Sequence, residues 1–163
     1  MNMASKTAAL TNAFSLPGEG RGEAIMGVTQ IYKLEAQRSG GSLVCVEITV
    51  PPGEGIPLHT HRDEDESFHV IAGRVTIEGD DLPAASVALD AGSLFHGPRG
   101  RRHGFRCAGT EAAKILVLIT PGTGSQEMFG RLAELTRLHG TKLAPALVAE
   151  VARDYGITLA AAA

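Results

Sequence analysis

The sequence has few of the features that mark secreted, membrane-spanning or nucleic-acid-binding proteins. Its two cysteines, Cys45 and Cys107, lie in apolar runs and are too few for the disulfide framework of a small secreted domain. No run approaches the roughly 18 apolar residues of a membrane span. Residues 1–17 lack a basic segment followed by a long apolar stretch, so we expect no signal peptide. The net charge of −3 gives no basic face for nucleic acid. We therefore expect a soluble cytoplasmic protein without nucleic-acid or membrane partners.

Short apolar runs separated by glycine and proline make up most of the chain. Its 163 residues amount to about one domain, and a hydrophobic content of 44% can supply a core. Twenty glycines and eight prolines lie mainly between these runs, as in all-β folds with many turns. Strands are expected at 28–34, 43–50, 67–71, 74–78, 86–89, 93–97, 103–107 and 113–120. A count of about eight or nine short strands favours closure into a barrel, because closure removes unpaired edges.

After residue 122 the apolar period changes from two to about three or four, which predicts helices. One face of a helix over about 125–139 would carry Met128, Leu132, Leu135 and His139. Thr123 and Gln126 have the spacing of a capping box at its start. A second helix is expected over about 145–155. We expect the helices to cover one barrel mouth or to form a dimer contact.

These patterns divide the chain into three parts. Residues 1–24 are expected to form a flexible N-terminal arm, residues 25–122 the β-barrel, and residues 123–160 a C-terminal helical segment. The arm lacks sustained apolar periodicity, so we expect it to pair with the sheet of a partner subunit.

Three histidines and a carboxylate have the spacing of metal ligands. Residues 53–73 read Gly-x5-His-x-His-x4-Glu-x6-Gly and contain His59, His61 and Glu66, while residues 92–103 read Gly-x5-Pro-x-Gly-x2-His and end at His103. Side chains alternate along a strand, so His59 and His61 point the same way and reach one ion. Zn, Fe, Mn and Ni sites take imidazole nitrogen and carboxylate oxygen. Glu66 and His103 would complete such a site if their strands lie alongside.

The two strings resemble motifs 1 and 2 of the cupin superfamily, over about residues 40–120. The resemblance implies an all-β fold, the cupin (RmlC-like) antiparallel β-barrel or jelly roll, here followed by two C-terminal α-helices. It implies that His59, His61, Glu66 and His103 bind one divalent transition metal, which is Fe, Mn, Ni or Zn. The second motif often has Asn four residues after its histidine, where this chain has Cys107. That departure concerns the local turn rather than the metal.

The resemblance to single-domain cupins, among them quercetinase-like enzymes, also implies a function. It suggests a metal-dependent oxidoreductase of the dioxygenase type, acting on a small organic substrate bound in the barrel. Glu66 would then be both a metal ligand and the base that takes a proton from a substrate hydroxyl. Isomerases, lyases and noncatalytic small-molecule- or metal-binding cupins share the ligand set and stay open as alternatives. A homodimer is also implied.

Charged residues near the motifs have less specific interpretations. Residues 63–65 are predicted to form a solvated acidic turn, with Asp65 as the substitute ligand if the loop register differs by one residue. Four arginines surround His103, and they either pair with these carboxylates or guide an anionic substrate to the barrel mouth. They are Arg99, Arg101, Arg102 and Arg106.

Three further histidines and one strand complete the set of candidates. His69, His96 and His139 are interpreted as structural, with His69 facing outward because it lies three residues after Glu66 in a strand. Within strand 43–50, the more polar face is predicted to line the cavity. That orientation would place Cys45 and Glu47 near the substrate.

Overall fold

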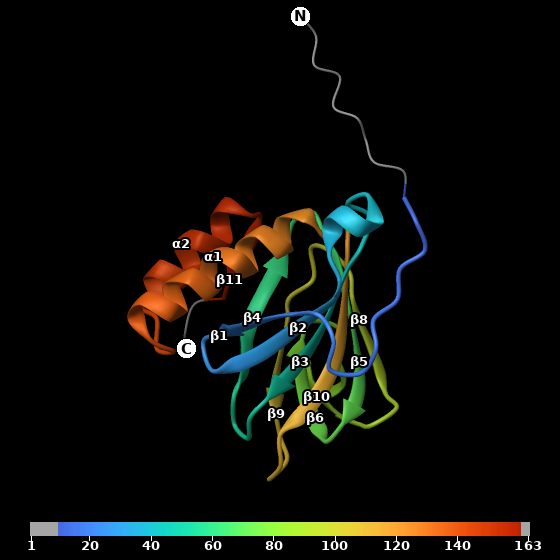
Figure 1. Ribbon diagram of the computed structural model, residues 1–163. Helices are drawn as coiled ribbons and strands as arrows, with labels where there is room; N and C mark the ends of the chain where they lie inside the picture. Colours follow the sequence, from blue (N-terminus) through green and yellow to red (C-terminus); the bar gives the residue numbers. More distant parts are fainter. Residues whose placement is uncertain (1–9, 161–163) are drawn as a thin grey trace, which may run out of the picture.

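The computed structural model describes residues 10–160 as two antiparallel β-sheets with two helices at one end (Figure 1). One sheet has six strands in the order β1-β2-β3-β10-β5-β8, and the other has five in the order β11-β4-β9-β6-β7. The strands are β1 (Arg21–Ile25), β2 (Val28–Leu34), β3 (Val44–Val50), β4 (Gly55–His61), β5 (Asp65–Ala72), β6 (Arg74–Gly79), β7 (Ser86–Asp90), β8 (Leu94–Gly97), β9 (His103–Cys107), β10 (Ala113–Thr120) and β11 (Ile157–Leu159). The helices are α1 (Thr123–His139) and α2 (Pro145–Asp154), with short 3-10 helices at Ala36–Ser39 and Pro83–Ala85. The predicted fold class, a jelly roll with two C-terminal helices, is confirmed.

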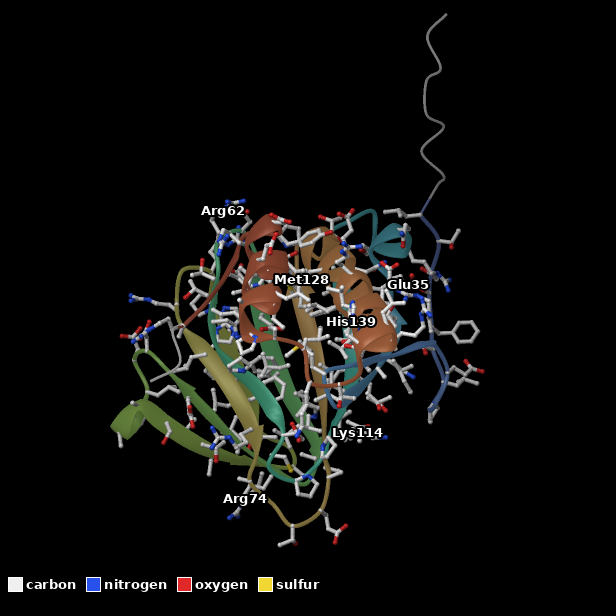
Figure 2. The ribbon with its side chains drawn as sticks, turned by 90° about the vertical axis from the view of Figure 1, so that its left-hand side faces the viewer. Glu35, Arg62, Arg74, Lys114, Met128 and His139 are labelled. Carbon is white, nitrogen blue, oxygen red and sulfur yellow. The ribbon has the colours of Figure 1, made fainter. Side chains whose placement is uncertain are left out.

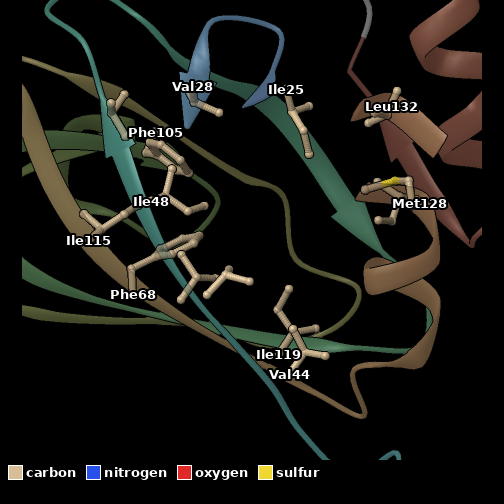
Figure 3. Close-up of a cluster of buried hydrophobic side chains, with 14 of the residues drawn as sticks. Ile25, Val28, Val44, Ile48, Phe68, Phe105, Ile115, Ile119, Met128 and Leu132 are labelled. Carbon is tan, nitrogen blue, oxygen red and sulfur yellow. The ribbon is translucent and has the colours of Figure 1, made fainter. Parts of the chain in front are cut away.

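The core lies between the two sheets because apolar residues alternate along the strands. In β10, Ile115, Val117 and Ile119 are fully buried, while the residues between them are half-buried. Figure 3 shows Ile115 and Ile119 packed in one cluster with Phe68 of β5 and Phe105 of β9. Each such side chain contributes about 1.5–3 kcal/mol when fully buried. This sum of apolar contacts, rather than any one of them, holds the sheets together.

Charged side chains lie on the outer faces, as Arg62, Arg74 and Lys114 do in Figure 2. Lys114 pairs with Glu47 at 3.0 Å, and Arg74 pairs with Asp90 at 2.6 Å. Exposed pairs of this kind contribute only about 0–1 kcal/mol each. The surface pairs therefore add little to a stability that comes from the core.

A tight hairpin joins β1 to β2. Ile25 pairs with Val28, and the two residues between them, Met26 and Gly27, have φ of 48° and 94°. Positive φ at both positions is what a type I′ turn requires, and glycine adopts it without strain. β1 begins at Arg21, inside the segment assigned to the N-terminal arm, and it pairs with its own chain. Residues 1–9 of that arm lie outside the described residues.

The two helices cover one end of the barrel, beside β1 and β11 (Figure 1). Met128, Leu132 and Leu135 of α1 are buried, as predicted, whereas His139 is exposed at the end of the helix. β11 follows α2 and pairs with β4, so the chain returns to the sheet that carries the histidines. Neither helix has the length and apolar character needed to cross a bilayer, within residues 10–160.

The predicted capping box of α1 is wrong. The N-cap is Gly122, which has no side chain to accept a hydrogen bond. Gln126 instead turns outward, and its Oε1 accepts a hydrogen bond from the Ala36 N–H at 2.7 Å. The start of α1 therefore needs an acceptor from another part of the chain.

Candidate metal centre

Three strands from both sheets bring the four predicted ligands together. His59 and His61 lie two residues apart at the end of β4, so both point into the barrel, and they are 5% and 3% exposed. β9 pairs with β4 in a register that puts His103 opposite His59. Glu66 comes from β5 in the other sheet. The predicted convergence of these residues is confirmed.

The nitrogen and oxygen atoms of the cluster face a common centre. One ligand atom from each of His59, His61, Glu66 and His103 lies within 4.8 Å of the other three. Glu66 Oε2 lies 3.0 Å from His103 Nε2, 3.4 Å from His61 Nε2 and 3.6 Å from His59 Nε2. These spacings suit donors arranged around one ion, and the four residues could hold a metal.

Backbone carbonyls orient two of the three imidazoles. His59 Nδ1 lies 2.9 Å from the Pro57 carbonyl oxygen, and His103 Nδ1 lies 3.2 Å from that of Arg101. A carbonyl only accepts, so in both rings Nδ1 can donate its hydrogen to the backbone, which leaves Nε2 available to give its lone pair to a bound metal. This is the tautomer that a metal bound at Nε2 requires.

The charges of the cluster also fit a cation. Burial would raise the pKa of Glu66, but the imidazoles of His103, His59 and His61 outweigh burial and hold that pKa well below its usual range. Burial would lower the pKa of His61, but the carboxylates of Glu64 and Glu66 outweigh it and raise the pKa to about 9. Without a metal, protonated His61 thus balances part of the negative charge. A divalent ion would take the place of that proton, because buried charges need a partner.

A cavity of about 80 Å³ opens beside the cluster. His59, His61 and Glu66 line it, and its other walls are almost entirely apolar. The apolar lining includes Ile25, Val28, Ile48, Phe105, Met128 and Leu132, several of which Figure 3 shows. Met128 and Leu132 belong to α1, so the helices close the cavity, which was one of two roles expected for them.

Gln30 of β2 is a polar lining residue that the sequence analysis missed. It is 2% exposed, and its Nε2 donates to Glu23 Oε2 and to the Tyr32 hydroxyl, both at 3.1 Å. Both amide hydrogens are used in these bonds, which leaves the carbonyl oxygen as the remaining polar group. Its position between Val28 and Tyr32, on the inward-facing side of β2, was the available signal.

The acidic turn differs from its prediction at one position. Asp63 is exposed, and Asp65 accepts a bidentate hydrogen bond from Arg99 at 2.8 and 2.9 Å, so Asp65 is not a ligand. Glu64, predicted to be solvated, is 5% exposed and lies behind His61. Its burial depends on α1, which packs over it from a distant part of the chain.

The arginines pair with surface carboxylates instead of lining the cavity. Arg99 binds Asp65, but Arg101 and Arg102 pair with Asp81 and Asp80, at 3.4 and 2.8 Å. The acidic partners of the last two are therefore on the β6–β7 side and not in turn 63–65. Within residues 10–160, the cavity lining contains no arginine.

The face of β3 that lines the cavity is the apolar one, which corrects the prediction. Ile48 lines the cavity, whereas Glu47 pairs with Lys114 on the outside. Cys45 lies on the same side as Glu47, and burial raises the pKa of its thiol. The barrel interior takes the β-branched side chains because they complete the core.

Cys107 fits the position where the cupin motif often has Asn. Its Sγ donates to the Glu111 carbonyl oxygen at 3.3 Å, so the thiol bridges the turn between β9 and β10.

His96 Nδ1 bonds with Ser67 Oγ at 2.9 Å on the outer face, and His69 is half-buried away from the cluster. Within residues 10–160, neither histidine belongs to the metal cluster.

Comparison with known proteins agrees with this architecture. A family model for the cupin domain matches residues 46–119. KdgF from Halomonas sp. is 19% identical, with a TM-score of 0.59 over 68% of this chain and 94% of that chain. An RmlC-like cupin from Shewanella frigidimarina NCIMB 400 is 20% identical, with a TM-score of 0.59 over 71% and 96%. A predicted oxalate decarboxylase from Thermotoga maritima is 20% identical, with a TM-score of 0.53 over 57% and 79%.

At such identities these likenesses show the fold alone. No curated protein sequence matched the chain. The family match spans the strands that carry all four candidate ligands. The histidines and the glutamate of the two sequence motifs lie together around one centre. Residues 46–119 of this chain form a cupin domain.

Proposed function

We propose that this protein is a metal-dependent oxidoreductase of the dioxygenase type that acts on a small organic substrate inside the barrel. The observation that carries the proposal is that His59, His61 and Glu66 line a largely apolar cavity. A bound divalent metal with three imidazoles and one carboxylate would keep net positive charge and, if six-coordinate, two open positions for O2 or water and a chelating substrate. The proposed reaction is of the type that quercetinase-like cupins carry out.

The surrounding residues support the proposal through their chemistry. Glu66 is ionised and buried, so it is the candidate base for a substrate hydroxyl. The apolar walls favour a largely apolar substrate. Gln30 is the additional polar lining residue and would accept a hydrogen bond from a substrate hydroxyl.

Oxygen uptake tests the proposed activity. Protein loaded with Fe, Mn, Ni or Co is offered a flavonol, a β-diketone and a catechol, and we expect uptake with at least one pairing. Glu66→Gln should abolish it, whereas Asp65→Asn, a matched change at a carboxylate that binds Arg99, should not. If no pairing consumes oxygen, the dioxygenase proposal fails.

The size of the cavity favours a second candidate, a noncatalytic cupin that binds a metal or a small molecule. Its volume of about 80 Å³ is below the roughly 300–1,000 Å³ usual for ligand pockets. Metal binding without turnover of any substrate would support that role. An isomerase or lyase would instead convert a substrate without consuming oxygen.

We also propose a cytoplasmic homodimer. Cys45 and Cys107 are free, which suits a reducing compartment.

The dimer rests on the apolar side chains of Leu10, Phe14 and Leu16, which are 63%, 82% and 54% exposed. Burial against a second copy would remove this apolar surface from water. Deleting residues 1–20, which spares β1, should convert a dimer to a monomer in gel filtration. An unchanged dimer would refute a role for the arm.

A further inference from the structure

We infer that Glu64 is a positioning residue that links the first turn of α1 to the metal ligand His61. The inference rests on the proposed metal site. Glu64 lies in the connection between β4 and β5, and it is 5% exposed. A carboxylate buried to this extent is costly unless it is paired. Its partners therefore indicate what it does.

Both oxygens of the carboxylate bind the first turn of α1. Glu64 Oε1 accepts a hydrogen bond from the Ser125 backbone N–H at 3.1 Å, and Oε2 accepts one from the Ser125 hydroxyl. The helix cannot supply its own cap, because a Cβ at the N-cap Gly122 would lie 2.4 Å from the Val44 nitrogen. A negative charge at a helix N-terminus is also favourable. Glu64 thus acts as the cap from another element.

The Oε2 atom that accepts from the Ser125 hydroxyl also faces His61. Glu64 Oε2 lies 3.4 Å from His61 Nδ1. Within residues 10–160, this nitrogen is the buried side-chain polar atom that has no hydrogen-bond partner. The Nδ1 atoms of His59 and His103 face backbone carbonyls, so Glu64 holds the equivalent position for His61. A movement of a few tenths of an ångström would bring the pair into hydrogen-bonding range and direct Nε2 to the ion.

This arrangement connects the cover of the cavity to its metal site. Met128 and Leu132, one to two turns after Ser125, line the cavity from α1. Occupancy of the site would fix the His61 ring, and through Glu64 it would stabilise the first turn of α1. Metal binding and closure of the cavity are then coupled.

Metal titration of four proteins tests the link. Binding of Zn²⁺ and Co²⁺ is measured by calorimetry, and the Co²⁺ absorption spectrum is recorded, for the wild type, Glu64→Ala, Glu64→Gln and Asp63→Ala. Asp63 is the matched control, because it is a neighbouring carboxylate that is exposed and pairs with Arg62 at 2.8 Å. We expect Glu64→Ala to lower affinity by about 10–100-fold and to alter the spectrum. Glu64→Gln keeps one acceptor oxygen and should lose less, and Asp63→Ala should match the wild type.

Hydrogen exchange supplies the second readout. Zn²⁺ should slow exchange of the amides in the first turn of α1 in the wild type and in Asp63→Ala, but not in Glu64→Ala. Normal affinity and spectrum in Glu64→Ala would overturn the inference, and if that variant does not fold, the same values in Glu64→Gln decide. A wild-type protein that binds neither ion would overturn the metal site itself. Wild-type binding that survives both Glu64 variants would overturn only the link.

Discussion

At the scale of single residues, the cluster depends on a small neighbour as well as on its ligands. Gly97 ends β8, and a Cβ there would lie 2.7 Å from His103 Nδ1. The side chain of an alanine would displace the imidazole and strain its contact with the Arg101 carbonyl. Only glycine leaves the ring where the cluster needs it.

Gly97→Ala should therefore weaken Zn²⁺ binding by at least about tenfold, as loss of an orienting contact does in other metal sites. Gly130→Ala is the control, because a Cβ at this position in α1 meets nothing within 4 Å. That substitution should leave the affinity unchanged and stabilise the protein by about 0.5–1 kcal/mol. Equal Zn²⁺ affinity in calorimetry for Gly97→Ala and the wild type would contradict the account.

Residue types and spacing predicted the four candidate ligands but not their surroundings. His59 and His61 could be placed because strand alternation is local, and the two motifs supplied Glu66 and His103. Glu64 looked like part of a solvated turn, since its burial depends on Ser125, 61 residues later. The prediction of which face of β3 lines the cavity was wrong for a similar reason. The side chains that pack opposite a strand decide which of its faces points inward, and the polarity along that strand alone does not.

At the scale of elements, α1 both completes the core and closes the cavity. Leu132 is 6% exposed and lines the cavity, whereas Leu138 on the same helix is 56% exposed. The two leucines have the same side chain and differ in burial. Substituting each of them by alanine therefore separates the contribution of packing to stability from that of helix propensity.

Leu132→Ala should reduce the free energy of unfolding by about 2–5 kcal/mol, because it leaves a hole between α1 and the barrel. Leu138→Ala should change it by no more than about 0.5 kcal/mol. Urea denaturation followed by circular dichroism measures both. Similar losses in the two variants would mean that α1 does not pack on the barrel as described.

Most strands of the barrel were predicted close to their observed bounds, whereas β1 and β11 were not predicted. β2, β9 and β10 agree with their predicted bounds, and β2 and β10 are rich in β-branched and other apolar residues. β1 lies in a segment without an apolar period, and the Met26-Gly27 turn that forms it was not recognised. β11 has three residues, too few to show a period, and it forms because α2 returns the chain to β4.

At the scale of the whole molecule, a metal would join the two sheets. His59, His61 and His103 belong to the five-stranded sheet, and Glu66 belongs to the six-stranded one. An ion bound to all four would add a link across the core that the unfolded chain cannot form. Binding to the folded state alone stabilises that state by mass action.

A saturating metal should accordingly raise the free energy of unfolding, by about 2.7 kcal/mol when free metal is 100 times the dissociation constant. Thermal denaturation with Zn²⁺ and with a chelator measures the shift. His69→Ala, a change at a half-buried histidine outside the cluster, should keep the shift. The His59→Ala, His103→Ala double variant should show none, and a shift of equal size there would place the metal elsewhere.

The most direct test of the metal centre is the metal content of untagged protein, measured by elemental mass spectrometry beside the His59→Ala, His103→Ala variant. We predict about one equivalent of a divalent transition metal in the wild type and none in the variant, from a cluster that places four donors within 4.8 Å. A redox-active metal would support the oxidoreductase proposal, and zinc would favour the alternatives. Absence of metal from the wild type even after reloading, or equal metal in both proteins, would contradict the account.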